Sequence, residues 1–102
     1  MTDNLNNITY HELCRTEGIE GEYIVAIVEY GIVTPNNRAA VEKWEFEASS
    51  VYWIKKASRL RLDFEIDWVA VSMVIKLLRQ KDALEKENRR INRLLQRFVD
   101  EG

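Results

Sequence analysis

The sequence has little of what most protein chemistry needs: one histidine, one cysteine, four glycines and one proline in 102 residues. A single cysteine cannot form an internal disulfide, and one histidine with one cysteine cannot supply the usual ligand set of a zinc site. No apolar run approaches the roughly 20 residues that a membrane span needs. The polar start Met1-Thr2-Asp3-Asn4 lacks the regions of a signal peptide. We therefore expect a cytoplasmic protein without metal or cofactor.

The few candidate catalytic groups do not form a recognisable constellation. His11 and Cys14 are three residues apart, but such a pair also needs an orienting group and an oxyanion site. The glycines form no phosphate-binding loop. Alternating carboxylates at Asp63, Glu65 and Asp67 are more typical of a solvated loop between two helices than of acid–base catalysis. The sequence predicts that the protein is not an enzyme.

Charge is distributed unevenly along the chain, although the formal net charge is only −2. Residues 1–75 carry twelve acidic and seven basic side chains, a net charge of −5. Residues 76–99 carry eight basic and three acidic side chains, a net charge of +5. The two ends of the chain should therefore attract different partners, although a basic C-terminal half also suits any solvated helix.

Capping signals predict two short helices at the start of the chain. Thr9 and Glu12 have the spacing of a capping box, and Gly18 can end the helix that follows. A second helix should run from Glu20 to Tyr30 and stop at Gly31, because its apolar residues recur at steps of three and four. Two short helices joined by a tight turn predict a helix-turn-helix.

The segment after Gly31 suggests a β-hairpin, or wing, followed by further helices. Residues 32–35 and 41–46 are short apolar stretches on either side of an asparagine-containing turn. Ser49 or Ser50 should cap a third helix, and Asp67 a fourth. The apolar positions of the third helix are Tyr52, Ile54, Ala57, Leu60 and Leu62. From Asp67 to Phe98 the sequence has neither glycine nor proline, which permits one long helix or two.

Apolar residues in the C-terminal segment recur every seven positions, as in helices that pair in a coiled coil. A neighbouring seam includes Leu95 and a polar asparagine that could fix the register. We predict dimerisation through this segment, against the alternative that it folds back on its own domain. The predicted dimer contacts are Leu77, Leu84, Asn88, Ile91, Leu95 and Phe98.

These features predict a mainly α fold with a winged helix-turn-helix head over residues 1–78 and a coiled-coil tail over residues 79–102. Such a head usually binds DNA through basic side chains. Here no Lys or Arg occurs between Thr16 and Asn37, where the recognition helix should lie. An acidic surface would repel a polyanion, so a basic protein partner is the better prediction.

The chain also resembles known proteins. The layout from Ile8 through Gly18-Ile19, followed by residues 29–35, resembles the head of MerR-type regulators. Residues 57–63, Asp67-Trp68 and the segments 84–90 and 95–99 resemble the chaperone-modulator family CbpM. The similarity runs from about Ile8 to Val99. It implies an adaptor that binds the J-domain of CbpA, a DnaJ-like co-chaperone, and inhibits both its action with DnaK and its DNA binding.

Carboxylates on the head are the candidate contacts with the basic helix of such a J-domain. They are Glu20, Glu22, Glu29, Glu42, Glu45, Glu47, Asp63 and Glu65. Two other functions stay open at this stage. One is a MerR-like DNA-binding transcriptional regulator that uses the basic tail, and the other is an oligomerisation module with no dedicated partner.

Overall fold

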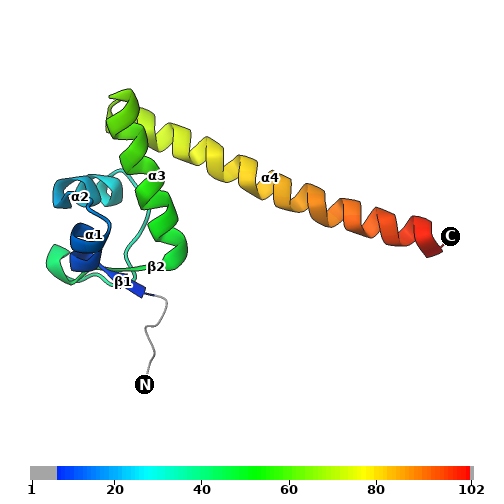
Figure 1. Cartoon of the computed structure of the whole chain (residues 1–102), viewed down its shortest axis with the longest axis horizontal. Helices are drawn as coiled ribbons and strands as arrows, with labels where there is room; N and C mark the ends of the chain where they lie inside the picture. The colour runs from blue at the N-terminus through cyan, green and yellow to red at the C-terminus, as the bar shows by residue number, and fades with distance from the viewer. Residues whose placement is uncertain (1–6, 102) are drawn as a thin grey trace, which may run out of the picture.

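The structure is a computed structural model that describes residues 7–101, and over these residues the chain is mainly helical. The elements are β1 (Asn7–Thr9), α1 (Tyr10–Thr16), α2 (Gly21–Glu29), the 3-10 helix η1 (Val41–Lys43), β2 (Glu45–Glu47), α3 (Ala48–Phe64) and α4 (Trp68–Glu101). We call residues 7–78 the head and residues 79–101 the tail; the tail extends away from the head as one straight helix (Figure 1). The N-terminal stretch Met1-Thr2-Asp3-Asn4 lies outside the described residues.

The predicted helix-turn-helix is confirmed, including the features that delimit its helices. The Thr9 hydroxyl accepts a hydrogen bond from the Glu12 amide at 3.1 Å, and the Glu12 carboxylate accepts one from the Thr9 amide at 2.9 Å. This is the capping box at the start of α1. Gly18, with φ of 69°, and Gly31, with φ of 75°, adopt the left-handed conformation after α1 and α2.

The predicted hairpin between residues 32–35 and 41–46 is wrong. β2 pairs with β1, antiparallel, and places Ile8 opposite Phe46. Residues 32–40 form neither a helix nor a strand, although Ile32 and Val33 are buried in the core. The Asn36 amide donates to the Glu45 carbonyl at 2.7 Å, a single bond rather than a ladder. Residues 41–43 form η1 where the second strand was expected to begin.

The third helix begins earlier than predicted and buries fewer of the expected residues. Neither Ser49 nor Ser50 is its N-cap; α3 starts at Ala48, and Glu47 occupies the cap position without a side-chain hydrogen bond. The reason is that β2 runs directly into the helix, so its last residue already has the extended backbone of a cap. Of the apolar positions named for this helix, Ile54 and Ala57 are buried, whereas Tyr52 and Leu62 are 53% and 61% exposed.

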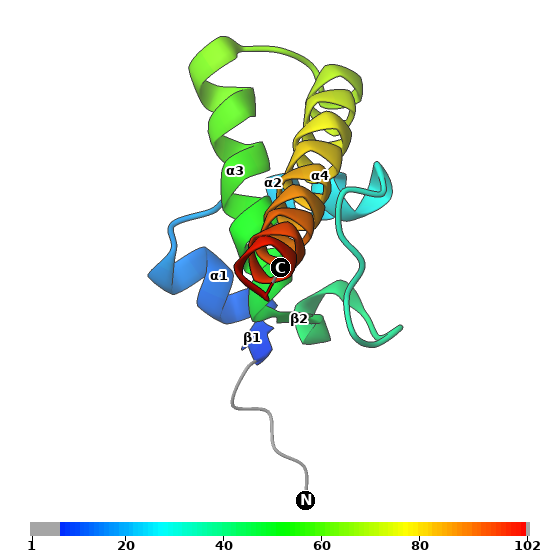
Figure 2. The ribbon, with the colours of Figure 1, turned by 90° about the vertical axis from the view of Figure 1, so that its right-hand side faces the viewer.

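A single core holds the head together. Phe46, on β2, is fully buried in this core, to which α1, α2, α3 and α4 contribute, and α3 packs against α4 (Figure 2). The last head residues of α4 that reach the core are Val71 and Ile75. The buried apolar residues are Leu13, Ile19, Ile24, Ile27, Ile32, Val33, Phe46, Ile54, Ala57, Val71 and Ile75.

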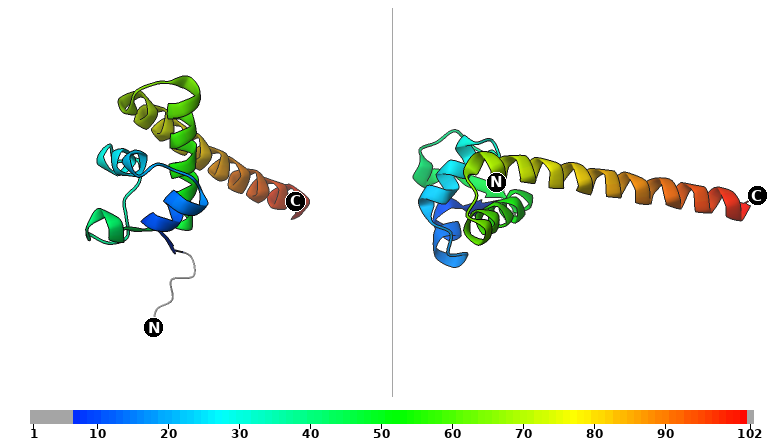
Figure 3. Two further views of the ribbon diagram at one scale, coloured as in Figure 1. Left: turned by 60° about the vertical axis from the view of Figure 1, so that its left-hand side comes forward. Right: turned by 90° about the horizontal axis from the view of Figure 1, so that it is seen from above.

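The fourth helix is continuous over 34 residues, about 50 Å at 1.5 Å per residue. The Asp67 carboxylate accepts a hydrogen bond from the Ala70 amide at 2.9 Å, which confirms the predicted cap. The tail meets the head at its first residue, where the Arg79 guanidinium lies 5.1 Å from the centre of the Trp53 ring. Every residue from Lys81 to Glu101 is exposed, and this part of α4 extends away from the head (Figure 3). In residues 7–101 no helix is both long and apolar enough to cross a lipid bilayer.

Candidate protein-interaction surfaces

The six predicted dimer contacts are exposed on α4, Leu77 at the end of the head and the other five on the tail. Leu77, Leu84, Ile91 and Phe98 follow one another at seven-residue steps, and Leu84 and Phe98 are 70% and 76% exposed. Asn88 and Leu95 flank this row, and Leu84, Asn88 and Ile91 line one shallow groove of about 520 Å³. We call the six residues the α4 stripe. Large apolar side chains at this spacing on a solvated helix are typical of a surface that pairs with another helix.

The exposed apolar surface of α4 extends further toward the head than the sequence predicted. Val69 and Met73 precede Leu77 at steps of four residues, and Met73 is 61% exposed. Val71 and Ile75, two positions further along in each case, point into the core instead. One side of α4 therefore packs on the head while the other continues the α4 stripe. The four-residue spacing from Val69 to Leu77 was the signal that could have identified this extension.

Ion pairs within the tail support the isolated helix. Lys81 Nζ lies 2.7 Å from Glu85 Oε2, and Arg90 Nη2 lies 2.6 Å from Glu87 Oε2. The hydrogen bond from Lys81 lowers the pKa of Glu85, and that from Arg90 lowers the pKa of Glu87. Pairs three or four residues apart stabilise a helix that lacks tertiary contacts.

The eight predicted acidic contacts do not form one patch, because they lie in three separate groups. The first is on α2, the second is around η1 and β2, and the third is at the C-terminal end of α3. In that order the groups are Glu20, Glu22 and Glu29; Glu42, Glu45 and Glu47; Asp63 and Glu65. Since α3 has 17 residues, the second and third groups are separated by about 25 Å along its axis.

The group on α2 is the most coherent of the three. Glu22 and Glu29 are seven residues apart, which places both on the same side of the helix, about 10 Å from each other along its axis. Both are exposed, while Ile24 and Ile27 point into the core. This outward side of α2, which a DNA-binding helix-turn-helix would present to the duplex, carries no basic residue.

In the group around η1 and β2, one carboxylate already forms a hydrogen bond within the head. Glu45 and Glu47 share one face of β2, since the intervening Phe46 points into the core. The Asn7 side chain donates a hydrogen bond to the Glu45 carboxylate at 3.4 Å. Burial raises the pKa of the Tyr10 phenol, and the charges of Cys14 and Glu42 raise it further.

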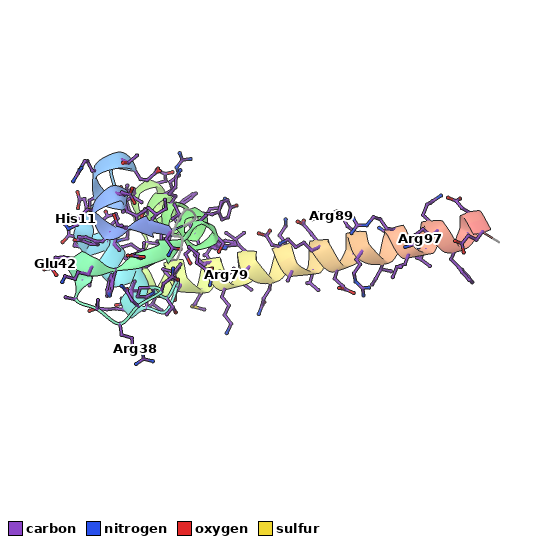
Figure 4. The ribbon with its side chains drawn as sticks, turned by 90° about the horizontal axis from the view of Figure 1, so that it is seen from below. His11, Arg38, Glu42, Arg79, Arg89 and Arg97 are labelled. Carbon is purple, nitrogen blue, oxygen red and sulfur yellow. The ribbon has the colours of Figure 1, made fainter. Side chains whose placement is uncertain are left out.

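The third group closes α3, where Glu65 is the C-cap with φ of 53°. Basic side chains occur at both ends of the molecule: Arg38 projects from the head, while Arg89 and Arg97 project from the tail, far from Glu42 (Figure 4). His11 and Glu42 are both exposed on the head (Figure 4). Among residues 7–101 no three His, Cys, Asp or Glu side chains are placed to hold a metal ion.

The head is a MerR-type helix-turn-helix, and comparison with known proteins agrees with that class. The family model described as MerR HTH family regulatory protein matches residues 8–93. Among curated proteins, the chaperone modulatory protein CbpM of Pseudomonas putida (strain W619) is 34% identical over 85% of both chains. CbpM of Citrobacter koseri is 33% identical over 89% of both chains, and that of Pseudomonas entomophila is 31% identical over 85% of both.

These matches cover the head and most of the tail. The chain belongs to the CbpM family of chaperone modulatory proteins, within the MerR helix-turn-helix class. The resemblance seen in the sequence is thereby confirmed. This family is one of regulators rather than a known family of enzymes.

Proposed function

We propose that the protein is a chaperone modulator that binds the J-domain of a DnaJ-like co-chaperone of the CbpA type. Binding inhibits the action of that co-chaperone with DnaK and its binding to DNA. The observation that carries the proposal is the acidic outward side of α2, formed by Glu22 and Glu29, in a chain of the CbpM family. A J-domain presents a basic helix to DnaK, and an acidic helix surface is electrostatically complementary to it.

Charge alone would not give a tight complex. Exposed ion pairs contribute only about 0.2–1 kcal/mol each, so apolar contacts near the centre of the interface must supply much of the affinity. The outward side of α2 offers them: Val25 and Ala26 lie between Glu22 and Glu29 and are partly accessible, and Tyr30 is exposed at the end of the helix. The carboxylates therefore direct the encounter, and the apolar residues between them hold the complex.

We further propose that the protein is a homodimer held by the α4 stripe. Supporting this, the apolar side chains of the stripe are exposed along a helix that no other described segment covers. Pairing two such helices would remove this surface from water, which is the main driving force of association. Asn88 would lie within the interface and oppose shifted registers.

The test of J-domain binding is calorimetric titration of the protein with a purified CbpA-type J-domain at moderate salt. We expect micromolar or tighter binding. The variant Glu22→Lys, Glu29→Lys should bind at least about tenfold more weakly, since it turns attraction into repulsion. The matched control is Asp100→Lys, Glu101→Lys, which changes the net charge equally at the end of the tail and should bind normally. Equal binding by both variants would exclude the α2 surface.

The test of dimerisation is sedimentation equilibrium of the double variant Leu84→Glu, Ile91→Glu. Burying two pairs of carboxylates in an apolar interface is unfavourable, so this variant should sediment as a monomer with an unchanged helical circular dichroism spectrum. A wild-type mass would rule out the α4 stripe as the interface.

A MerR-like DNA-binding regulator is the alternative function, and it would use the basic tail. The same preparation distinguishes the two, because a specific regulator binds a palindromic site with an affinity that falls steeply with salt. Tight, salt-sensitive binding to such a site, together with no heat on addition of the J-domain, would favour the regulator.

A further inference from the structure

The outward face of α3 differs in charge from the rest of the head. Residues 1–75 contain seven basic side chains, and four of them are on α3: Lys55, Lys56, Arg59 and Arg61. Arg61 is used internally, since it donates to the Ile66 carbonyl at 3.0 Å and lies against the Trp68 ring. The other three point outward, at three- and four-residue steps between Tyr52 and Leu62. We call Tyr52, Lys55, Lys56, Arg59 and Leu62 the α3 basic face.

Two adjoining grooves run along this face. One, of about 460 Å³, is lined by Ala48, Val51 and Tyr52 together with the three outward cations. The other, of about 370 Å³, lies between α3 and the loop before α2, and shares Lys55 and Arg59 with the first. Because both grooves are lined by Lys55 and Arg59, they lie next to each other, and we call the pair the α3 depression.

The cations in this depression are held in different ways. Lys55 Nζ lies 3.1 Å from Glu17 Oε1, which positions it on the ridge between the two grooves. Lys56 Nζ lies 5.5 Å from the centre of the Tyr52 ring, so it stays beside that aromatic side chain. Within residues 7–101, Arg59 forms no ion pair. Lys56 and Arg59 are therefore available to carboxylates from outside.

A buried hydroxyl in the same depression also lacks a partner. Ser58 lines the second groove and is 6% exposed, and its Oγ has no hydrogen-bond partner among the described residues. A buried polar atom left without a hydrogen bond costs about 1–3 kcal/mol, so most such atoms in folded proteins are satisfied. A ligand seated in the groove could supply the missing partner.

We propose that the α3 basic face is a docking site for an acidic protein segment with apolar side chains at helical spacing. Carboxylates of the segment pair with Lys56 and Arg59, and its apolar side chains pack on Tyr52 and Leu62. These two residues are ten positions apart, about 15 Å or three helical turns, which is the reach of a short helix.

A protein segment fits this face better than a nucleic acid does. Glu17 and Glu20 line the second groove, and Asp63 follows Leu62, so a continuous polyanion would meet carboxylates at one end. A peptide can place its few charges only where the cations lie. Its apolar contacts also match the two large exposed side chains, which phosphate backbones would leave uncovered.

The site is independent of the J-domain surface proposed above. The outward side of α2 is acidic and would bind a basic partner, whereas the α3 basic face would bind an acidic one. The protein could then hold two partners of opposite charge at once, and the loss of either interaction should leave the other intact.

The experiment is a selection of displayed random peptides on the full-length protein, followed by titration of the best peptide by fluorescence anisotropy. The enriched peptides should carry acidic residues next to apolar residues three or four positions apart. The variant Lys56→Glu, Arg59→Glu should bind the best peptide at least about tenfold more weakly. The control Lys86→Glu, Arg93→Glu makes the same charge change on the tail and should bind within twofold of the wild type.

Several results would overturn the proposal. They are no enrichment, enriched peptides without excess acidic residues, equal weakening in both variants, and displacement of the peptide by a short DNA duplex with similar affinity. Larger oligomers of the wild type that disappear in Lys56→Glu, Arg59→Glu would show that the site binds a second copy instead. Titration of Lys56→Glu, Arg59→Glu with the J-domain keeps the two proposals separate, since that affinity should not change.

Discussion

Two positions in the head restrict which residue they can hold without strain. Glu65 closes α3 in the left-handed conformation, where glycine is preferred, and it also places a negative charge at a helix C-terminus. Gly21, in contrast, begins α2 directly against the side chain of Tyr10. Each residue makes a distinct prediction about stability.

Glu65→Gly should stabilise the protein by about 0.5–1 kcal/mol, because glycine adopts a positive φ without steric cost. Urea unfolding at fixed protein concentration measures the change. Glu65→Gln is the control, since it removes the charge and keeps the backbone strain. If the glutamine variant gained as much stability as the glycine variant, the helix dipole and not the backbone would be the cause.

Gly21→Ala should destabilise the protein by about 1–3 kcal/mol, as overpacking does in other cores. A Cβ at this position would lie 2.1 Å from Tyr10 Oη and 3.2 Å from Tyr10 Cζ. The double variant Gly21→Ala, Tyr10→Phe removes the closer atom and should recover most of the loss. Thermal unfolding of the wild type, the two single variants and the double variant measures the coupling free energy between the two residues. Additive effects on stability would show that the phenol hydroxyl is not what excludes a side chain at residue 21.

The elements were predictable from the sequence to different degrees, and the reason lies in how local their signals are. The capping box of Thr9 and Glu12 and the cap at Asp67 act over three residues, so sequence alone identified them. β1 is only three residues long and pairs with a strand some 38 residues away. The sequence of β1 looks like the segment that precedes a capped helix, and no local pattern connects Ile8 with Phe46. For that reason the hairpin was predicted between residues 32–35 and 41–46, whereas β2 pairs with β1.

The sequence also predicted only part of the exposed surface of α4. Seven-residue spacing identified its free half, but the first turns have both sides covered by apolar residues, which hides the periodicity. The structure separates Val71 and Ile75, which pack on the head, from Val69 and Met73, which are exposed. The division of the chain at residues 78 and 79 stays a prediction, since the exposed apolar side of α4 crosses it.

Met73→Glu should therefore weaken the dimer even though residue 73 lies in the head. If the partner covers the whole exposed apolar side of α4, a carboxylate at residue 73 raises the dimer dissociation constant at least about tenfold. Gln96→Glu adds the same charge on the opposite side of the helix and should change little. Sedimentation equilibrium compares the two. Wild-type association of Met73→Glu would confine the interface to the tail.

At the scale of the whole molecule, the sequence predicted the fold class and the charged character of each end, but not how the acidic side chains are grouped. The sequence contains Glu22, Glu42 and Glu65, but only the fold shows that they lie on three separate surfaces. The α3 basic face was not predicted, because its basic side chains were included in the net negative charge of residues 1–75. Tyr52 and Leu62 were named with Ile54 and Ala57 as apolar positions of one helix, but their spacing does not say which of them the rest of the head covers.

The polarity of charge along the molecule predicts the orientation of the dimer. In a parallel pair, the eight basic side chains of residues 76–99 would lie beside the same eight in the partner. In an antiparallel pair centred on Leu84, by contrast, most basic side chains lie level with a different kind of residue in the partner: Lys81 lies level with Glu87, and Lys86 with Asp82. The apolar surface of α4 runs from Val69 to Phe98 and has its midpoint near Leu84. A parallel pair in register and an antiparallel pair centred near Leu84 would both cover this surface, but the antiparallel pair separates most of the like charges, so we expect this arrangement.

Cysteine cross-linking distinguishes the two orientations. With Cys14 replaced by serine, a cysteine at Leu77 should not cross-link to itself, because an antiparallel pair centred on Leu84 places it opposite Ile91. Mixing Leu77→Cys with Ile91→Cys should give a disulfide-linked heterodimer on oxidation, since residues opposite each other bring their sulfur atoms within bonding range. Leu84→Cys should cross-link to itself in either orientation and serves as the positive control. A homodimer of Leu77→Cys without the mixed product would establish parallel pairing, and the charge argument would then be wrong.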